Sequence, residues 1–585
     1  MRKPAKKAVR KAGSAAKTSR TAGAATRRTL SGNGMKTFSM HAFDKATAPM
    51  IDTLMQERNT NTSFALTKAD DLPQLDPETV AARYLDQALQ SKSVPSFTAP
   101  KTGGVESEFK SLGSESIPLT GTKIVKFRQT LNKIPVYGSL VSVELDDRND
   151  LVSIGSSLGK PTDVDPVAKI SPADAVKAVV KYPGYRKRLD GITPRLNYYF
   201  DRIQSKWRLV YILEDVPVSS ISTKKHETEL APRLMDYVVD AQSGKVVAEL
   251  PRTSSMASNA ENEVDGLGNM RQFRAETNGN RKVLNDTTLE VQTFDFEFGD
   301  PEVDEGRLPG RAIVSPPRWA PSAVSAHSNA SAVAQFLRDV LRRNNIDNNG
   351  GPMISSINCV VMQESRDGRQ WFNAFWNSRQ MVYGQRLNGN TLMSLSVDLD
   401  VVGHEMFHGV TERTARLEYV AQSGALNESI SDIFGVIIAN FANPDPRTWN
   451  WLVGEGLSPD GKAFRDMSNP PAFDQPDNMR DFKVLPLTRR GDYGGVHTNS
   501  GIHNKAAFNI LTAVDATGNL VLTPAEVAAF FYLSLWQQLS RTSQFSDSRR
   551  GALISARSLF HNLPPNQQTA KLDAIANGFD AVGIT

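Results

Sequence analysis

The segment HEMFH at 404–408 constrains this chain more than any other stretch of its sequence. It lies in LDVVGHEMFHGVTERTA, where the spacing of the apolar residues predicts a helix. His404 and His408 are four residues apart, so their imidazoles share one helical face and can reach one tetrahedral zinc ion. Glu405 lies between them and can take a proton from a water on the open side of such an ion. With only eight histidines in 585 residues, chance would place this pattern in about 0.6% of such sequences.

A second helix is predicted at 423–441, in SGALNESISDIFGVIIANF, and it offers a third ligand. Glu428 lies among apolar neighbours, and an ionised carboxylate is costly to bury unless it is paired or binds a metal. Asp432 follows one turn later, where it can accept the free ring N–H of a metal-binding histidine. The residues alone leave a plainer alternative open, in which both acids lie on the surface of an amphipathic helix.

Composition narrows the class of protein. A chain of 585 residues is too long for one ordinary domain, so two to four domains are expected. No run approaches the roughly 18 apolar residues of a membrane span. Cys359 is the single cysteine, which excludes an intrachain disulfide and a cysteine-rich zinc site.

The net charge of +5 comes from one end of the chain. Residues 1–43 contain eleven Lys and Arg and no acid, and they have almost no large apolar residues, so a disordered basic tail is predicted there. Removing these eleven from the 68 basic residues leaves 57 against 63 acidic ones, a net charge of −6 for 44–585. A mildly acidic body does not have the charge of a nucleic-acid-binding domain.

Alternating and helical patterns divide the rest of the chain into α+β units. Helices are predicted at 74–94, at 171–182 with Ser171 as N-cap, at 328–344, and from a capping box at Thr523 through Trp536. The predicted segments are a tail at 1–43, a partly helical segment at 44–120, an α+β segment at 121–250, a polar linker at 251–270, a strand-rich segment at 271–400 and a mainly helical one at 401–585.

Several stretches in order along the chain resemble the thermolysin-like (bacillolysin) zinc metallopeptidases. They are NAFWNSRQMVYG at 373–384, GHEMFHGVTE, GALNESISDIFG, FRDMSNP at 464–470, GDYGGVHTNSGIHNKAAF at 491–508 and FDAVGIT at the end. The segment 122–250 is similar to that family's propeptide, with a fungalysin/thermolysin-type subdomain followed by a PepSY-like one. The resemblance implies a multidomain α+β fold, in which the propeptide precedes a catalytic domain with a mainly β and a mainly α lobe.

The resemblance also implies roles for the residues that match. His404, His408 and Glu428 would bind one zinc ion per chain, and Glu405 would be the general base. Asp432 would orient a zinc-binding histidine. Zinc and nearby donors would stabilise the negative charge that builds on the carbonyl oxygen during attack by water.

Two further groups are implied only by the resemblance. His497, oriented by Asp492, and Tyr419 would donate hydrogen bonds to the oxyanion. The residues implied to bind the peptide substrate are Arg465, Asn373 and the backbone at Ala374.

The resemblance implies an apolar pocket for the residue that follows the scissile bond, and hence cleavage before hydrophobic residues. Its implied lining is Leu392, Leu395, Val401 and Phe464, and the bulk of Phe464 predicts a shallow pocket. The family's double calcium site is not expected, because Ala439 replaces one of its acids. Asp400 and Glu455 remain, so at most one calcium ion is expected.

The resulting interpretation is a monomeric zinc endopeptidase made as a proenzyme, with its own propeptide as inhibitor and folding aid and with maturation inside 251–270. The alternative is a protein that binds zinc but is inactive because its cleft stays blocked. A third hypothesis gives the tail at 1–43 a nucleic acid or another anionic surface as partner. The tail lacks the apolar stretch of a recognisable signal peptide, while the family favours secretion, so the sequence leaves localisation open.

Overall fold

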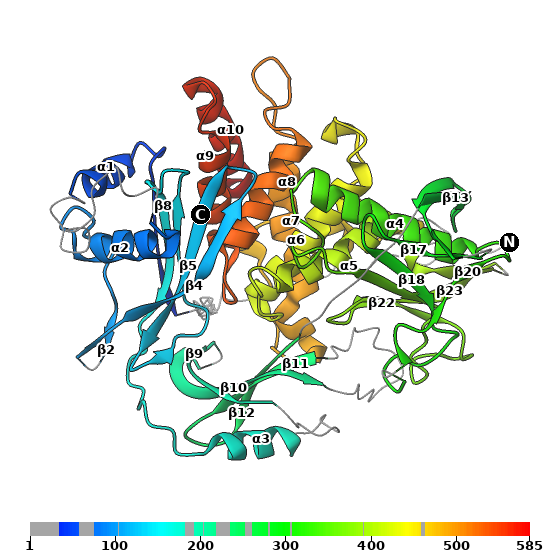
Figure 1. Cartoon of the computed structure of the whole chain (residues 1–585), viewed down its shortest axis with the longest axis horizontal. Coiled ribbons are helices and arrows are strands. Elements are labelled where there is room, and N and C mark those ends of the chain that lie inside the picture. The colour runs from blue at the N-terminus through cyan, green and yellow to red at the C-terminus, as the bar shows by residue number, and fades with distance from the viewer. Residues whose placement is uncertain are drawn as a thin grey trace, which may run out of the picture.

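The computed structural model describes residues 34–57, 75–102, 104–181, 192–202, 204–217, 234–251, 260–278, 281–304, 307–389, 391–457 and 462–585. They form an amino-terminal part (described residues of 34–251), which holds two sheets, and a larger carboxy-terminal part (described residues of 260–585). Figure 1 shows the amino-terminal part in blue and cyan at the left and below, against the helices of the carboxy-terminal part.

The amino-terminal part begins with a sheet covered by two helices. α1 (Ala48–Glu57) and α2 (Pro77–Gln90) pack on it, and the shared core includes Tyr84 and Phe127. Asp76 caps α2 by accepting the Thr79 N–H at 2.9 Å. The strands run antiparallel in the order β1-β8-β7-β5-β4, with β6 beside β5. Their bounds are β1 Met35–His41, β4 Glu108–Ile117, β5 Thr122–Leu131, β6 Ile134–Pro135, β7 Leu140–Leu145 and β8 Leu151–Gly159, and a small hairpin joins β2 (Lys101–Thr102) to β3 (Val105–Glu106).

A second antiparallel sheet completes this part, in the order β12-β11-β10-β9. Its bounds are β9 Arg195–Asp201, β10 Lys206–Pro217, β11 Leu234–Asp240 and β12 Val246–Pro251. α3 (Pro172–Val180) packs against it. The predicted N-cap Ser171 is confirmed, and it forms a capping box with Asp174.

The first half of the carboxy-terminal part is built mainly from strands. A seven-stranded sheet has the order β17-β18-β21-β23-β22, with β19 beside β18 and β24 beside β23, and α4 (Pro321–Asp339) packs on it. The pairs β18–β21 and β21–β23 are parallel. The bounds are β13 Ala260–Val264, β14 Met270–Arg274, β15 Glu276–Asn278, β16 Arg281–Val283, β17 Asn285–Asp286, β18 Val291–Asp295, β19 Arg311–Ala312, β20 Val314–Ser315, β21 Met353–Ile357, β22 Trp371–Trp376, β23 Met381–Asn388 and β24 Thr391–Ser394.

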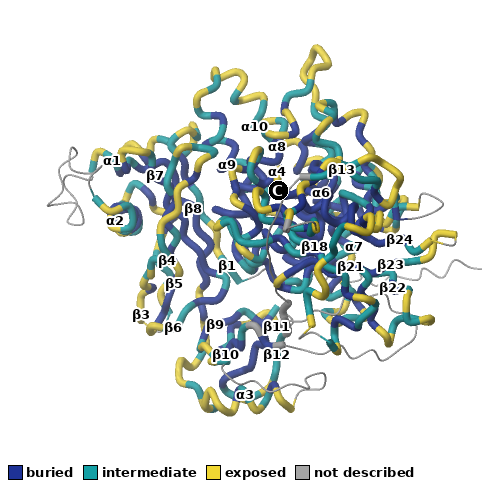
Figure 2. Tube along the Cα trace, turned by 45° about the vertical axis from the view of Figure 1, so that its right-hand side comes forward, coloured by how far each residue is buried: buried dark blue, intermediate teal, exposed yellow. Residues whose placement is uncertain are grey.

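The second half is mainly helical, and its central helix is buried along almost its whole length. The bounds are α5 Leu399–Glu412, α6 Ala421–Asn440, α7 Asp492–Leu511, α8 Pro524–Leu533, α9 Phe545–Phe560 and α10 Pro565–Asp580, with a short pair of strands, β25 (Leu452–Val453) and β26 (Arg465–Asp466). Figure 2 shows α6 among the buried segments at the centre of the molecule. A mixed α+β fold with a helical carboxy-terminal domain is therefore confirmed.

Three sequence predictions need correction at their boundaries. Met35–His41, inside the predicted tail at 1–43, is an ordered edge strand whose partner β8 lies more than a hundred residues away, so no local pattern signals it; residues 1–33 lie outside the described residues. Within the predicted linker, Ala260–Val264 pairs with β14, and 252–259 lie outside the described residues. α4 begins at Pro321 rather than at 328, because a proline fits the first turn, and it ends at Asp339.

Among the described residues, none of the helices has the length and apolar character that a membrane span requires.

Candidate metal centre and active site

Two helices cross at the site, and two glycines let their backbones approach. A Cβ on Gly435 of α6 would overlap the carbonyl oxygen of Asp400 in α5. A Cβ on Gly403 of α5 would lie 3.0 Å from the Cα of Gly435. Since glycine has no side chain, α5 and α6 can pack at this short separation.

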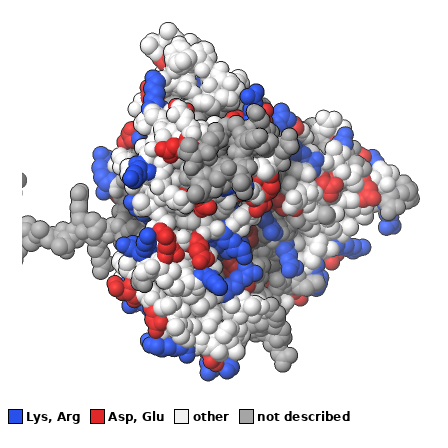
Figure 3. Space-filling view, turned by 60° about the vertical axis from the view of Figure 1, so that its left-hand side comes forward, with Lys and Arg blue, Asp and Glu red and all other residues white. Residues whose placement is uncertain are grey.

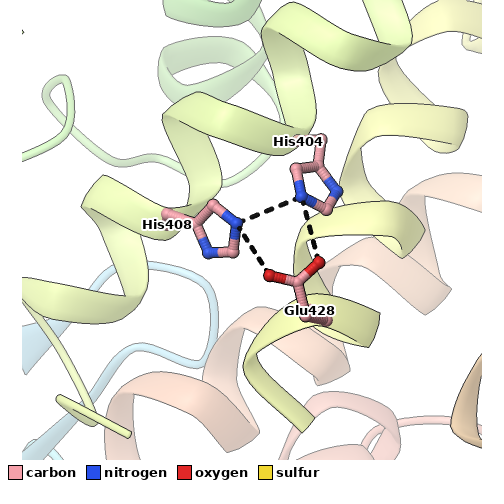
Figure 4. Close-up of side chains that lie close together, drawn as sticks. All are labelled: His404, His408 and Glu428. Carbon is pink, nitrogen blue, oxygen red and sulfur yellow. Dashed lines mark hydrogen bonds and ion pairs between the residues drawn. The ribbon is translucent and has the colours of Figure 1, made fainter. Parts of the chain in front are cut away.

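This crossing brings three potential metal ligands together (Figure 4). His404 Nε2 and His408 Nε2 are 3.1 Å apart. Glu428 Oε2 lies 3.5 Å from His404 Nε2, and Oε1 lies 3.4 Å from His408 Nε2. Glu428 Oε2 is buried and receives no hydrogen bond from the described residues. Two imidazoles and one carboxylate with converging donor atoms fit the ligand set of a catalytic zinc ion.

The other ring nitrogens are held by hydrogen bonds. His404 Nδ1 lies 2.8 Å from Asp432 Oδ1. His408 Nδ1 lies 2.9 Å from Asn427 Oδ1 and 3.1 Å from Ser431 Oγ. These contacts fix the ring orientation and leave each Nε2 free to face Glu428.

Asp432 is the centre of a buried network. Its Oδ1 also accepts a hydrogen bond from Arg465 Nη2 at 2.7 Å, and its Oδ2 accepts one from Asn504 Nδ2 at 2.8 Å. Burial raises the pKa of Asp432, but the charges of Arg465 and His404 outweigh it and lower that pKa to about 2. Asp432 therefore stays ionised at neutral pH.

The charges around the three ligands also favour a cation. Burial opposes ionisation of Glu428, yet His497, His408 and His404 hold its pKa well below its usual range. Burial lowers the pKa of His404, but Asp432 and Glu428 together raise it to about 10. A metal ion would take the place of the proton that His404 otherwise holds.

Glu405 lies beside the ligands, with 7% of its surface exposed. Burial raises the pKa of its carboxyl, and the neighbouring His404 and His408 oppose that rise. A carboxylate with a raised pKa is a better proton acceptor near neutral pH than an exposed one.

His497, Asp492 and Tyr419 form one hydrogen-bonded group next to Glu428. His497 Nδ1 lies 2.6 Å from Asp492 Oδ1, and the Tyr419 hydroxyl lies 3.1 Å from His497 Nε2. The Tyr419 hydroxyl also donates to Glu428 Oε1. Burial opposes protonation of His497, while Glu428 and Asp492 raise its pKa. His497 and Tyr419 can thus offer two donors beside the metal ligands.

A break at the start of α7 puts His497 in this position. Tyr493, Gly494 and Gly495 have positive φ angles of 46°, 94° and 80° and interrupt the helix. The His497 N–H then donates to Asp492 Oδ2 at 2.8 Å, so the same carboxylate holds both the backbone and the ring.

A cavity of about 300 Å³ opens beside His404, Glu405 and Glu428. Asn373 and Ala374 of β22 line it, together with Arg465 and His497. The Asn373 side chain accepts a hydrogen bond from the Ala374 N–H at 3.1 Å. Apolar side chains form much of the wall, namely Phe372, Leu395, Val401, Val453 and Phe464.

The lining differs from the sequence prediction in three residues. Leu392 does not line the cavity, because it lies on β24 at the edge of the sheet. Phe372 and Val453 line it and were not predicted. The Phe464 ring lies 6.0 Å from that of Phe372, and the Arg386 guanidinium lies 5.0 Å above Phe372.

A second cluster of potential ligands lies behind the amino end of α5. Carboxylate oxygens of Asp398, Asp400 and Glu455 lie within 4.8 Å of one another. Asp400 Oδ1 is buried without a hydrogen-bond partner among the described residues. Burial and the neighbouring Asp398 and Glu455 raise the pKa of Asp400 well above its usual range. Asp398 was not identified as a potential ligand from the sequence, because the resemblance pointed only to Asp400 and Glu455.

Three polar residues around the metal ligands were also missed, namely Asn427, Ser431 and Asn504. Asn427 and Ser431 lie on α6 within one turn of Glu428, and this position could have indicated that they contact a metal-binding histidine. Asn504 reaches Asp432 from α7, 72 residues later, and no spacing in the sequence reveals that contact.

Comparisons with known proteins agree with this geometry. The protein-family model for the thermolysin metallopeptidase catalytic domain matches residues 261–412. The family model for the thermolysin metallopeptidase alpha-helical domain matches residues 415–584. The Fungalysin/Thermolysin Propeptide Motif matches residues 107–158.

Curated relatives match over most of the chain. Bacillolysin of Brevibacillus brevis is 30% identical over 495 residues, which cover 82% of this chain and 86% of the relative. Thermolysin of Alicyclobacillus acidocaldarius is 29% identical over 566 residues, covering 89% and 92%. The precursor of protealysin, a metalloproteinase from Serratia proteamaculans, matches as a solved structure with 27% identity and a TM-score of 0.40, covering 53% of this chain and 90% of that one. The chain is therefore a metalloendopeptidase that belongs to the thermolysin (bacillolysin) family and carries that family's propeptide motif.

Proposed function

We propose that this chain is made as an inactive proenzyme and, once mature, cleaves peptide bonds on the amino side of hydrophobic residues with one zinc ion. The observation that supports this most is the convergence of His404, His408 and Glu428 beside Glu405, at the wall of a largely apolar cavity. The alternative is a zinc-bound but inactive binding protein whose cleft stays blocked.

Zinc bound by the two histidines and Glu428 supplies a Lewis acid that polarises the substrate carbonyl and makes a water molecule more acidic. Glu405 accepts a proton from the attacking water and later returns it to the leaving amine. Its raised pKa suits both steps, because the group must gain and lose a proton near neutral pH.

His497 and Tyr419 donate hydrogen bonds to the carbonyl oxygen as negative charge develops there. Asp492 holds the His497 ring so that Nε2 faces the substrate side, and it favours the protonated ring. Loss of one such donor commonly slows a reaction by about 10²- to 10³-fold.

The peptide would lie along β22, where Asn373 and the backbone of Ala374 bind it in extended form. Arg465, held by Asp432, would bind a substrate carbonyl. The apolar wall accepts the hydrophobic side chain after the scissile bond, and the Phe464 and Phe372 rings limit the depth of that pocket.

Residues 34–251 would act as the propeptide, with β9–β12 and α3 as its PepSY-like subdomain. Maturation would fall within 252–259, because 260–264 already pairs with β14 of the carboxy-terminal part. Secretion, a monomeric state and any binding of anionic surfaces by the tail at 1–43 remain hypotheses from the sequence.

The acidic cluster would hold at most one calcium ion. Asp398, Asp400 and Glu455 offer oxygen ligands, and the unpartnered Asp400 Oδ1 supports a cation there.

The test compares casein hydrolysis by the matured chain with that by Glu405→Gln, with zinc content measured for both. We expect Glu405→Gln to keep one zinc ion per chain and to lose activity by at least about 10³-fold. Glu412→Gln makes the same change at the far end of α5 and should leave activity within about twofold. Equal activity in wild type and Glu405→Gln would refute the assigned base. If the matured wild type binds zinc but cleaves nothing, the binding-protein alternative replaces the proposal.

A further inference from the structure

A second cavity lies between the two parts of the chain, away from the metal ligands. It has a volume of about 220 Å³. The first sheet and β9–β10 form one wall, and the turn after α5 together with the segment after α8 forms the other. Five cationic side chains line it: Lys126, Arg128 and Arg195 from the amino-terminal part, and Arg416 and Arg541 from the carboxy-terminal part.

Carboxylates neutralise some of these charges. Arg541 forms ion pairs with Glu214 at 2.8 Å and Asp236 at 3.1 Å. Lys126 lies 3.5 Å from Glu115. Arg195 lies only 3.7 Å from the other oxygen of Glu214, so it shares a carboxylate that Arg541 already uses.

Two guanidinium groups at the cavity are not neutralised. The guanidinium groups of Arg128 and Arg416 form no ion pair or hydrogen bond with any residue in the described part of the chain, and the two residues come from opposite walls. Five cations therefore face three carboxylates. Burial and the nearby Arg541 lower the pKa of Arg128, while Glu214 opposes that shift. Figure 3 shows Lys and Arg side chains gathered near the middle of the face it presents, beside acidic ones.

We propose that this cavity binds a small phosphate-type oxyanion, either inorganic phosphate or the phosphoryl group of a small ester, between Arg128 and Arg416. Guanidinium groups present planar pairs of N–H donors that match tetrahedral oxyanions. The volume admits such a group with a few waters but excludes a folded macromolecule. The site does not depend on the peptidase reaction.

An anion bound here would join the propeptide to the catalytic part, because each wall contributes a guanidinium. One lining residue is also connected to the candidate active site. The backbone oxygen of Arg541 accepts the Glu418 N–H at 2.8 Å, and Glu418 directly precedes Tyr419. Binding to the docked form alone stabilises that form by mass action. Bound phosphate would thus favour the uncleaved, assembled proenzyme.

The test uses the full chain with Glu405→Gln, so that no self-cleavage interferes. Thermal unfolding is followed in sodium phosphate and in sodium chloride at equal ionic strength and pH, and phosphate binding is measured by calorimetric titration. We expect one site per chain and a rise in Tm of about 3–6 °C at saturating phosphate. Glycerol phosphate distinguishes free phosphate from a phosphate ester as the ligand. An equal rise in Tm would show that a phosphoryl group is sufficient for binding, and no rise would show that the site binds only free phosphate.

Arg128→Gln and Arg416→Gln, each added to this chain, should abolish the phosphate-dependent rise. Arg366→Gln removes one charge from an exposed loop and should keep it. An equal rise in all variants, or no binding heat with the parent, would overturn the proposal. A rise of the same size in acetate would overturn it as well, since it would show no preference for phosphate. If either Arg variant fails to fold, the titration of the parent decides alone.

Discussion

Asp432 contacts both a proposed metal ligand, His404, and a residue proposed to bind substrate, Arg465. It contacts His404, Arg465 and Asn504, and it is fully buried. This one buried carboxylate orients His404 and compensates the charge of Arg465. Its removal should therefore weaken zinc binding and also lower the stability of the fold. This double dependence could not be predicted from the sequence, which indicated only the contact with a histidine.

We predict that Asp432→Asn weakens zinc binding by about 10- to 100-fold, because His404 loses its charged partner. The variant should also unfold more easily, by about 3–5 kcal/mol, since Arg465 is left without a buried counter-charge. Competition with a zinc chelator and urea unfolding measure the two effects. Asn504→Ala removes the neutral contact and is the control, with a smaller effect on both. Unchanged zinc affinity in Asp432→Asn would contradict the assigned role.

His327 gives a pH dependence that is separate from the metal site. It is buried on α4, where Nδ1 lies 2.9 Å from Thr293 Oγ1 and Nε2 lies 2.8 Å from Arg274 O. Burial lowers its pKa to about 3 from an unfolded value of 6.5. Between these values the unfolded chain binds a proton that the folded chain does not, so His327 destabilises the fold progressively as pH falls below about 6.5.

His327→Gln should remove this dependence, because glutamine does not titrate. Both proteins carry Glu405→Gln. As the pH falls from 6 to 4.5, the unfolding free energy of the His327→Gln variant should rise relative to that of the parent by about 1.4 kcal/mol per pH unit. Urea unfolding at each pH measures the difference, which should stay constant between pH 7.5 and 8.5. Parallel curves over the whole range would rule out the buried neutral histidine.

At the scale of helices and strands, the sequence predicted those features that depend on interactions between residues close together in the chain. The N-cap at Ser171 and the capping box at Thr523 were confirmed because each depends on residues within one helical turn. The helix at Thr523 was expected to run through Trp536, but α8 ends at Leu533 and continues as a single wider turn over 534–538. The strand Met35–His41 was missed because its partner lies far along the chain. Likewise, the two helices that carry the proposed metal ligands were predicted, but the close approach that joins them was not.

That approach is the basis of a prediction for Gly435→Ala. The new Cβ would overlap the Asp400 carbonyl oxygen, so α5 and α6 must separate. We expect a loss of about 1–3 kcal/mol in stability and weaker zinc binding, because the histidines and Glu428 lie on opposite helices. Ala439→Gly, at an exposed position of α6, should cost about 1 kcal/mol through helix propensity alone and leave zinc affinity unchanged. Equal zinc affinity in both variants would show that the crossing tolerates a side chain.

At the scale of the whole molecule, the amino-terminal part, which we propose to be the propeptide, docks beside the cavity that holds Glu405. Arg202 Nη2 lies 2.7 Å from Glu418 Oε2, with side-chain exposures of 8% and 1%. The same guanidinium donates to Ser423 Oγ at 3.1 Å. These contacts bracket the segment that carries Tyr419. Among the described residues, no side chain of the amino-terminal part lines the cavity beside Glu405, so the observed docking contacts lie beside that cavity rather than in it.

Arg202→Gln should therefore weaken docking of the propeptide without changing the mature enzyme. Burial raises the pKa of Glu418, and Arg202 is the first group that opposes this rise. Loss of Arg202 leaves a buried carboxyl without its partner only while the parts are docked, because release exposes Glu418 to water. Breaking such a buried pair costs about 3–5 kcal/mol, so docking should weaken by at least about 10²-fold.

The measurement uses the Glu405→Gln chain after an added protease has cut within 252–259. Size-exclusion chromatography then reports whether the propeptide stays bound at a given dilution. We expect the Arg202→Gln propeptide to separate at concentrations where the parent complex persists. Arg148→Gln, in an exposed turn of the first sheet, should behave like the parent. Equal retention in all three would mean that the buried pair contributes nothing to docking and that the sheets hold the parts together by packing alone.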